Sequence, residues 1–281
     1  MMDIEPVKQT KLFGFDKEIS EFFKLYDSDR FPSKLLLSGK KGLGKSTLAY
    51  HFINYALSKN ESFKYDKNNY EINTNSPTFK TIINKSNPNL TIIDINQEKK
   101  SIDINQIREL IKNLNKSSFN SKSRFVLIDN IEYLNKNSVN ALLKVLEEPN
   151  QNINFILINN NKKILPTLLS RCINYKISLT NKESLKIANN LLEGKLNETI
   201  NNDLINYYIT PGNIFNLAKF GNTNGYDLSN YDLKKLLKII INKSHYKKDS
   251  LIKYIVFDLM EFYFNKLNSS FSLRINQKYS Y

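Results

Sequence analysis

Apolar residues in the first two thirds of the chain form two alternating kinds of pattern. Short continuous apolar runs have the length of buried β-strands, and they cover residues 34–38, 90–95, 124–129, 153–158 and 174–177. Between them, apolar residues recur at the spacing of one helix face over residues 11–31, 45–58, 104–114 and 139–146. Strands that alternate with helices predict an α/β domain, a parallel five-stranded sheet flanked by helices.

Polar residues and prolines mark the expected ends of these helices. Asp103 stands directly before the third helical stripe and is the expected cap of that helix. Asn137 or Ser138 is expected to cap the fourth helix, and Pro149 to end it. Residues 60–89 are polar and rich in asparagine, so irregular or short helical structure is expected there.

Beyond about residue 179 the strand-type runs stop and only helical stripes remain. These cover residues 182–193, 199–208, 213–220, 231–242 and 249–267. Gly194, the Pro211-Gly212 pair, and Gly221 with Gly225 separate several of them. The stretch 221–230 is the expected boundary within this part. The pattern predicts an α/β domain over 1–178, a small helical domain over 179–225 and a C-terminal all-helical domain over 226–281.

Composition narrows the class of protein. The chain has 281 residues and a single cysteine, Cys172, which excludes a disulfide framework and a cysteine-based zinc site and suits a reducing cytosol. No apolar run reaches the roughly 18–20 residues of a membrane span, and the first ten residues lack the apolar core of a signal peptide. The formal net charge of +14 indicates either a nucleic-acid partner or a general bias toward lysine, asparagine and isoleucine.

A glycine-rich loop, GKKGLGKST, stands between the first strand and the second helix. It matches the phosphate-binding pattern G-x-x-x-x-G-K-[ST] in the strand–loop–helix context that this chemistry requires. Glycines let backbone N–H groups surround a polyphosphate, and the helix N-terminus adds partial positive charge. Lys45 is expected on the β- and γ-phosphates of a nucleotide, and the Ser46 hydroxyl on Mg²⁺. The residues expected to bind the nucleotide are Gly39, Lys40, Lys41, Gly42, Leu43, Gly44, Lys45, Ser46 and Thr47.

The strand over 124–129 ends in Asp129, the expected partner of this loop. A carboxylate at the carboxyl end of a neighbouring strand can hold Mg²⁺, directly or through water. Many motor hydrolases with such a loop place a glutamate next, which orients the attacking water. Here the next residue is Asn130, and an amide is a poor base. Glu132 follows three residues after Asp129, but a turn or helix start is expected to direct its side chain elsewhere.

Two further segments make the combination recognisable. NALLKVLEEP (140–149) by itself is an amphipathic helix stopped by proline, and LPTLLSRC (165–172) by itself is a turn followed by an arginine. In order with GKKGLGKSTLA, VLIDNIEYLNKNSV and FILINNN, they resemble the clamp-loader branch of the AAA+ ATPases. Within that branch they resemble the delta-prime type of bacterial DNA polymerase III subunit. The resemblance covers about residues 10–225 and is most specific over 124–172.

The resemblance implies both a fold and a set of site residues. The fold would be a P-loop AAA+ domain followed by a small helical lid and a collar-type domain that is short for the family. The loop would bind ATP, Asp129 would lie on the metal side, and Asn159 or Asn160 would sense the γ-phosphate. Arg171 would act as an arginine finger on ATP held by the adjacent subunit. A guanidinium there completes the charge stabilisation only when the subunits close.

The resemblance also implies a role and partners. Such a subunit assists the ATP-dependent loading of a sliding clamp onto primed DNA. Its expected partners are the gamma/tau and delta subunits in a pentameric ring and, through that ring, the clamp and DNA. No membrane partner and no zinc are expected, and the expected location is the bacterial cytoplasm, associated with the nucleoid.

Three departures distinguish the chain from the motor subunits of the same family. Asn130 replaces the glutamate, the single cysteine leaves no four-cysteine zinc module, and Phe215 stands where the motors carry a lid arginine. We therefore expect weak or no ATP hydrolysis by the isolated chain. Whether the chain is itself an enzyme stays open at this point. The alternatives are a gamma/tau-type motor, a small-molecule or nucleotide kinase, and a non-catalytic DNA-binding module. A kinase would need a substrate lid with convergent arginines, and the few arginines of this chain are scattered, which disfavours that alternative.

Overall fold

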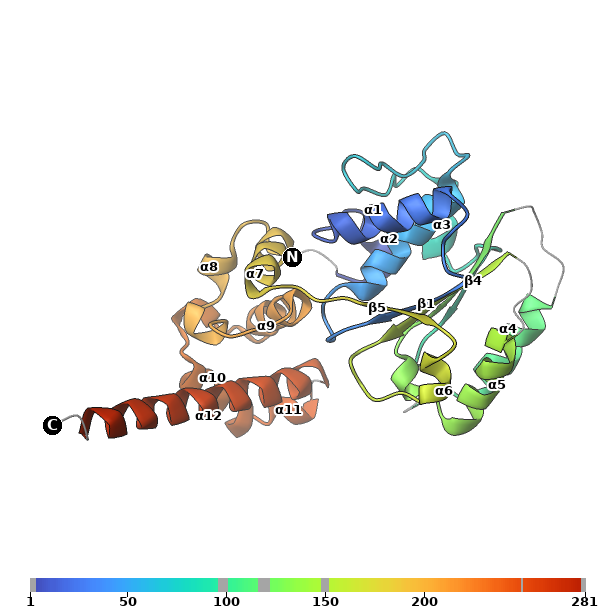
Figure 1. Ribbon diagram of the computed structural model, residues 1–281. Coiled ribbons are helices and arrows are strands. Elements are labelled where there is room, and N and C mark those ends of the chain that lie inside the picture. The colour runs from blue at the N-terminus through green and yellow to red at the C-terminus, as the bar shows by residue number, and fades with distance from the viewer. Residues whose placement is uncertain (1–3, 96–100, 116–121, 148–151, 249, 279–281) are drawn as a thin grey trace. The chain divides into compact units, whose positions relative to one another are not determined.

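The chain folds into two compact units (Figure 1). The computed structural model describes residues 4–95, 101–115, 122–147, 152–248 and 250–278. One unit, Asp3–Ser178, combines strands and helices, and the other, Leu179–Tyr281, is helical. A further division of the helical part near residue 225 remains a prediction.

The α/β unit is built on the predicted five-stranded parallel sheet. Its strands are β1 (Lys34–Ser38), β2 (Leu90–Ile93), β3 (Arg124–Ile128), β4 (Ile153–Asn159) and β5 (Ile173–Lys176). They lie in the order β2-β3-β4-β1-β5, and every pairing is parallel. Parallel strands bring their carboxyl ends to one edge, so the residues that follow β1, β3 and β4 lie together.

Helices cover both faces of this sheet (Figure 1). Helices α1 (Asp16–Asp27), α2 (Lys45–Ser58) and α3 (Pro77–Ile83) lie on one face, and α4 (Ile104–Leu114), α5 (Lys136–Glu147) and α6 (Pro166–Leu169) on the other. The core beneath α4 and α5 is mainly aliphatic, whereas the core beneath α1 and α2 is rich in aromatic rings. In the aromatic core the Phe31 and Phe52 rings stack 4.3 Å apart, and Phe22 and Phe125 meet Phe52 edge-on.

The ends of these helices follow local hydrogen bonding more closely than the apolar stripes. Asp103 caps α4 as predicted, and with Gln106 it forms a complete capping box. The expected cap of α5 is wrong by two or three positions. The capping residue is Asn135, and the helix begins at Lys136. The Asn135 side-chain oxygen accepts from both the N–H and the hydroxyl of Ser138. The predicted stop at Pro149 lies outside the described residues.

The helical unit contains α7 (Asn181–Leu191), α8 (Leu196–Thr199), α9 (Pro211–Asn224), α10 (Leu233–Asn242), α11 (His245–Lys248) and α12 (Ser250–Lys278). The predicted helix over 199–208 is wrong. Ile200 is extended, and the Asn201 side chain accepts from the Asp203 N–H, so only a short 3₁₀ turn follows. Asparagine competes with a helix by bonding its own backbone, which the apolar stripe does not reveal.

Gly221 also has a different role from the predicted one. It lies inside α9, which continues to Asn224 and ends at Gly225 in the left-handed conformation, φ 67°. A Cβ at Gly221 would lie 2.7 Å from Leu228 Cγ. Gly221 therefore allows close packing between α9 and the following turn, and Gly225 is the residue that ends the helix.

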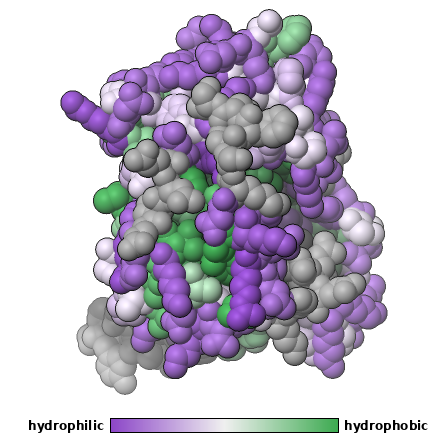
Figure 2. Space-filling view, turned by 90° about the vertical axis from the view of Figure 1, so that its right-hand side faces the viewer, coloured by the Kyte–Doolittle hydropathy of each residue, from purple (hydrophilic) through white to green (hydrophobic). Residues whose placement is uncertain are grey.

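The molecular surface is largely hydrophilic on the face shown in Figure 2, where apolar side chains gather in one area. Across the described ranges, no helix is long and apolar enough to cross a membrane. The buried apolar side chains instead form the cores of the two units.

Candidate nucleotide site

The glycine-rich loop joins the buried strand β1 to the helix α2. Gly39 follows β1 with φ 156°, and a Cβ there would lie only 2.4 Å from the Ile177 carbonyl oxygen. The Gly39 N–H donates to the Asn159 carbonyl at 3.2 Å, which fixes the loop to the end of β4. Gly44 stands before the first residue of α2 with φ 95°, a conformation that side chains rarely adopt. The backbone conformation at both positions, and the close contact at Gly39, therefore require glycine.

Lys45 is held inside this loop. Its Nζ donates to the Gly39 carbonyl at 2.9 Å, to the Lys40 carbonyl at 2.7 Å and to Asn160 Oδ1 at 3.0 Å. Only 3% of the residue is exposed. Burial lowers the pKa of Lys45 to about 8, although Asp129 and Glu132 act in the opposite direction. All three acceptors are uncharged oxygens, so they compensate the buried charge only in part.

Ser46 and Asp129 form the other half of the site. The Ser46 hydroxyl donates to Asp129 Oδ2 at 2.5 Å. Asp129 follows β3 and is held by its N–H, which donates to the Ile93 carbonyl at 2.9 Å. Burial raises the pKa of Asp129 to about 6, and the Asp94 carboxylate adds to the rise, while Ser46 opposes it. A hydroxyl and a carboxylate in contact are suitable ligands for a Mg²⁺ ion.

The remaining predicted loop residues surround these two groups. Lys40 and Lys41 have exposed side chains, Leu43 is buried, and Gly42 has φ 83°. Thr47 is half-buried in the first turn of α2. The loop therefore offers backbone N–H groups and two surface cations beside Lys45.

Glu132 lies at the site, contrary to the expectation that it points elsewhere. Asn130 adopts the left-handed conformation, φ 57°, and a 3₁₀ turn over Ile131–Tyr133 follows. This turn brings the Glu132 carboxylate to Asn160, whose side-chain Nδ2 donates to it at 3.0 Å and whose backbone N–H donates at 3.3 Å. Asn160 in turn accepts from Lys45, so one residue links Glu132 to the loop.

Asn130 itself is fully engaged by neighbouring polar groups. Its Nδ2 donates to Asp94 Oδ1 at 2.7 Å, and its Oδ1 accepts from Asn160 Nδ2 at 2.8 Å. The amide therefore connects the ends of β2, β3 and β4. In this position it organises the site and has no basic group to offer to a water molecule.

Of the two asparagines after β4, Asn160 contacts Lys45. The Asn159 side chain instead bonds the backbone of Lys162, donating to its carbonyl at 2.9 Å and accepting from its N–H at 3.2 Å. Asn159 ends a buried strand and Asn160 follows it directly, so the sequence pattern does not distinguish them. The structure brings Asn160 to Lys45, whereas Asn159 shapes the turn beside it.

Arg171 lies apart from this loop, on the turn after α6. Its Nε donates to Glu147 Oε1 at 3.0 Å, its Nη2 pairs with the same oxygen, and its Nη1 donates to the Thr167 carbonyl at 2.8 Å. About a third of the side chain, 32%, is exposed. The sequence motifs did not indicate the contacts with Glu147 and Thr167.

Phe215, at the position where the resemblance implied a lid arginine in motor subunits, is a core residue of the helical unit. Only 1% of it is exposed, and it lies on the buried face of α9 with Ile214 and Ala218. An arginine in that core would bury an unpaired charge at a high energetic cost.

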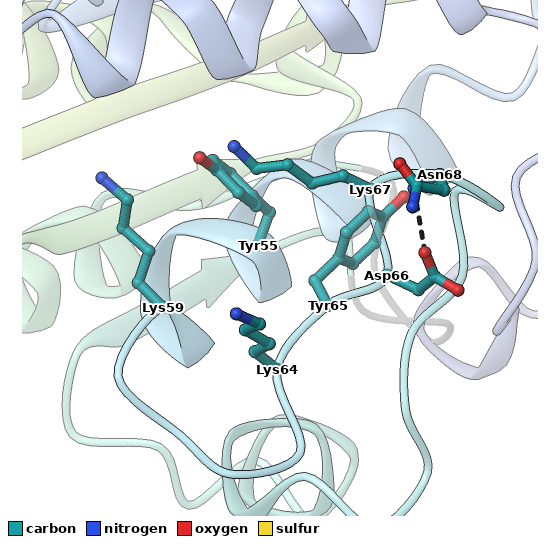
Figure 3. Close-up of a pocket in the computed structure, with 7 residues that line it drawn as sticks. All are labelled: Tyr55, Lys59, Lys64, Tyr65, Asp66, Lys67 and Asn68. Atoms are coloured by element: carbon teal, nitrogen blue, oxygen red, sulfur yellow. Dashed lines mark hydrogen bonds between the residues drawn. The ribbon is translucent and has the colours of Figure 1, made fainter.

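A second polar region lies at the opposite end of α2 (Figure 3). A pocket of about 640 Å³ is lined there by Tyr55, Lys59, Lys64, Tyr65, Asp66, Lys67 and Asn68. Because α2 has 14 residues, its two ends are about 20 Å apart, so this pocket is separate from the glycine-rich loop.

Asp27 organises the charges beside this pocket. Tyr55 donates to its carboxylate at 2.5 Å, Lys59 pairs with it at 2.8 Å and Lys67 at 3.0 Å. Burial alone would raise the pKa of Asp27, but hydrogen bonds from Lys59, Tyr55 and Lys67 outweigh it and lower the pKa to about 2. These cations already have a carboxylate partner, so the region is a structural ion-pair cluster.

Comparison with known proteins identifies the family. The model of the family described as DNA polymerase III, delta subunit, matches residues 15–181. The gamma subunit of DNA polymerase III from Buchnera aphidicola subsp. Schizaphis graminum is 34% identical over 155 residues, which are 53% of this chain and 39% of that protein. The delta-prime subunit of the same organism is 25% identical over 269 residues, 89% of this chain and 77% of that protein.

Further relatives include the delta-prime subunit of Bacillus subtilis, which is 30% identical over 53% of this chain and 44% of that protein. Among solved structures, a RuvB Holliday junction branch migration motor from Thermotoga maritima has a TM-score of 0.47 and 16% identity, over 86% of this chain and 81% of that one. The first three relatives are matched over 39%, 39% and 45% of their own length, so the chain spans less than half of each.

The matched span 15–181 contains the glycine-rich loop, Asp129 and Arg171, and it covers more than half of the chain. Delta-prime relatives come from several bacteria. The chain therefore belongs to the DNA polymerase III delta subunit family, and within the clamp-loader proteins it resembles the delta-prime subunits.

Proposed function

We propose that the chain is a delta-prime-type subunit of the bacterial clamp loader, in which it assists the ATP-dependent loading of the sliding clamp onto primed DNA. The observation that carries this proposal is the family match, because the matched residues include both the loop and Arg171. The partners would be gamma/tau and delta subunits in a pentameric ring, acting in the cytoplasm at the nucleoid. The helical unit would supply a lid over 179–225 and a collar-type domain over 226–281.

The first part of the proposal is that the loop binds ATP with Mg²⁺. The constraint on Gly39 supports it, since a loop with no side chain at that position lets backbone N–H groups approach phosphates. Lys45 is buried among uncharged acceptors and would gain charged ones from the phosphates. Ser46 and Asp129 would hold the ion, which neutralises charge on the β- and γ-phosphates. Asn160 would contact the γ-phosphate.

The second part is that the chain hydrolyses ATP weakly and supplies Arg171 to a neighbour. Asn130 replaces the usual base and is already bonded to Asp94 and Asn160. Within the described part of the chain, Arg171 bonds Glu147 at the end of α5 and Thr167 of α6, and it is partly exposed. An arginine finger delivered from an adjacent subunit raises hydrolysis by about 10³–10⁵-fold in other phosphoryl-transfer systems.

The test is reconstitution with the gamma/tau and delta subunits. We expect the chain to co-purify with them, and we expect Arg171→Ala to lower the DNA-stimulated ATPase of the complex at least tenfold. The same variant should leave ATP binding by the isolated chain unchanged, because Arg171 lies apart from its own loop. An unchanged ATPase in the Arg171→Ala complex would contradict the finger assignment.

The second candidate function is a gamma/tau-type motor, and one observation favours it. Asn160 accepts a hydrogen bond from Lys45 and donates one to the Glu132 carboxylate, so Glu132 lies at the site. Its carboxylate offers a base there, which Asn130 does not. The same reconstitution distinguishes the two functions. DNA-stimulated hydrolysis by the isolated chain, lost in Glu132→Gln, would make this chain a motor.

A further inference from the structure

The Arg171 guanidinium is held on two sides before any neighbour is present. Glu147 Oε1 accepts from Nε and pairs with Nη2, and the Thr167 carbonyl accepts from Nη1. These contacts use three of the five N–H groups of the guanidinium. Within the described ranges, no acceptor is found for the second N–H on each terminal nitrogen, so these two can meet another ligand.

Packing fixes the two residues that hold Arg171. Glu147 is the last residue of α5, and Thr167 lies in α6 beside Leu168. Leu168 is 1% exposed and belongs to the same aliphatic core as Leu142 and Leu146 of α5. The end of α5 and the Thr167 carbonyl are therefore held at a set distance, and the hydrogen bonds from Arg171 to Glu147 and Thr167 restrict the orientation of the guanidinium plane.

Glu147 does not add affinity for an anion, because its charge opposes a phosphate. It also adds little stability, since its side chain is 51% exposed and water screens exposed ion pairs. What the contact provides is orientation: a free arginine side chain loses rotamer entropy when it is fixed. Fixing it beforehand lowers that cost at the moment when a neighbour's triphosphate arrives.

We propose that Glu147 is a positioning residue that orients Arg171 so that its two remaining N–H groups meet the triphosphate bound by the adjacent subunit. This inference rests on the proposed function of Arg171. Glu147 touches neither nucleotide nor water in this scheme, and it acts only through the guanidinium.

The test uses the reconstituted complex, with Glu147→Ala, Glu147→Gln and Arg171→Ala compared. We expect Glu147→Ala to lower the kcat for ATP about tenfold with an unchanged KM, because orientation and not ground-state binding is lost. Glu147→Gln should retain most activity, since its amide oxygen still accepts from Arg171. Glu109→Ala, which removes an exposed carboxylate on α4, should behave as the original chain does.

A double variant distinguishes orientation from other effects. Glu147→Ala combined with Arg171→Ala should be no slower than Arg171→Ala alone, because the two residues act as one unit. Gel filtration checks that each complex assembles. If Arg171→Ala lowers kcat and Glu147→Ala leaves it unchanged or raises it, the positioning role is wrong while the finger stands. If Arg171→Ala has no effect, the proposed function itself fails.

Discussion

Lysines lie near a carboxylate at both ends of helix α2, but the pKa values of these groups shift in opposite directions at the two ends. At the N-terminal end the pKa of Lys45 is lowered to about 8 and that of Asp129 is raised to about 6, mainly by burial. At the C-terminal end the pKa of Asp27 is lowered to about 2, and that of Lys59 is raised, first by its hydrogen bond with Asp27. Burial thus disfavours the charges at one end, and direct pairing favours them at the other.

The difference separates a binding site from a structural cluster. Lys59 and Lys67 meet Asp27 directly, whereas Lys45 bonds only carbonyl and amide oxygens and Asp129 bonds the Ser46 hydroxyl. A buried cation and a buried carboxylate that bond no oppositely charged group among the described residues are stabilised when a phosphate and a metal ion supply the opposite charges. This comparison favours the loop end as the ligand site, although the pocket lies at the other end.

The largest effect should come from removing the cation at the loop end. We expect Lys45→Ala to weaken ATP binding by the isolated chain about 100-fold, because charge-assisted hydrogen bonds to phosphate are lost. Titration calorimetry with ATP and Mg²⁺ measures this change. Lys59→Ala is the matched control at the other end of the helix and should leave the affinity unchanged. Equal losses in both variants would remove the distinction between the two ends.

A smaller effect, of unusual sign, is expected for the carboxylate at the loop end. Because the folded-state pKa of Asp129 is raised from 3.8 to about 6, the folded protein loses stability as the pH rises from about 4 to about 6. At pH 7.5 we expect Asp129→Asn to stabilise the nucleotide-free protein by ~1–2 kcal/mol, seen as a higher Tm. The variant should also lose the extra stabilisation that Mg²⁺ gives in the presence of ATP. A lower Tm for the nucleotide-free variant would contradict this account.

The sequence predicted the scaffold better than the contacts made on it. Continuous apolar runs indicated all five strands, and helical stripes indicated α1, α2, α4 and α5, because both periodicities can be found in the sequence. The short helices α3 and α6 did not follow from such a stripe. The helix over 199–208 was wrong because Asn201 bonds its own backbone, and Gly221 was misinterpreted because its packing partner, Leu228, is a tertiary contact. Such competing or distant contacts leave no periodic signal.

The site shows the same limit. The Ser46 hydroxyl contacts Asp129, as expected from the loop motif and the end of β3, and Lys45 lies within the same loop. Their contacts with a nucleotide and Mg²⁺ remain predictions. The direction of Glu132 depended on the left-handed backbone of Asn130, which the Asp-Asn pair after a strand hints at but does not establish. The contact of Arg171 with Glu147 joins residues that are 24 positions apart, and only the packing of α6 against α5 reveals it.

The smallest effect should come from the carboxylate at the pocket end, and its sign should be opposite to that of Asp129. The folded-state pKa of Asp27 is lowered from 3.8 to about 2, so its contribution is complete above about pH 4 and disappears as the pH falls toward 2. We expect Asp27→Asn to destabilise the protein at pH 7 by ~1 kcal/mol, because partial exposure screens its pairs with Lys59 and Lys67. Urea unfolding at low and high salt measures this loss, which salt should reduce. Stabilisation by Asp27→Asn would mean that the two ends of α2 do not differ, and the argument for a ligand at the loop end would then rest on the motif alone.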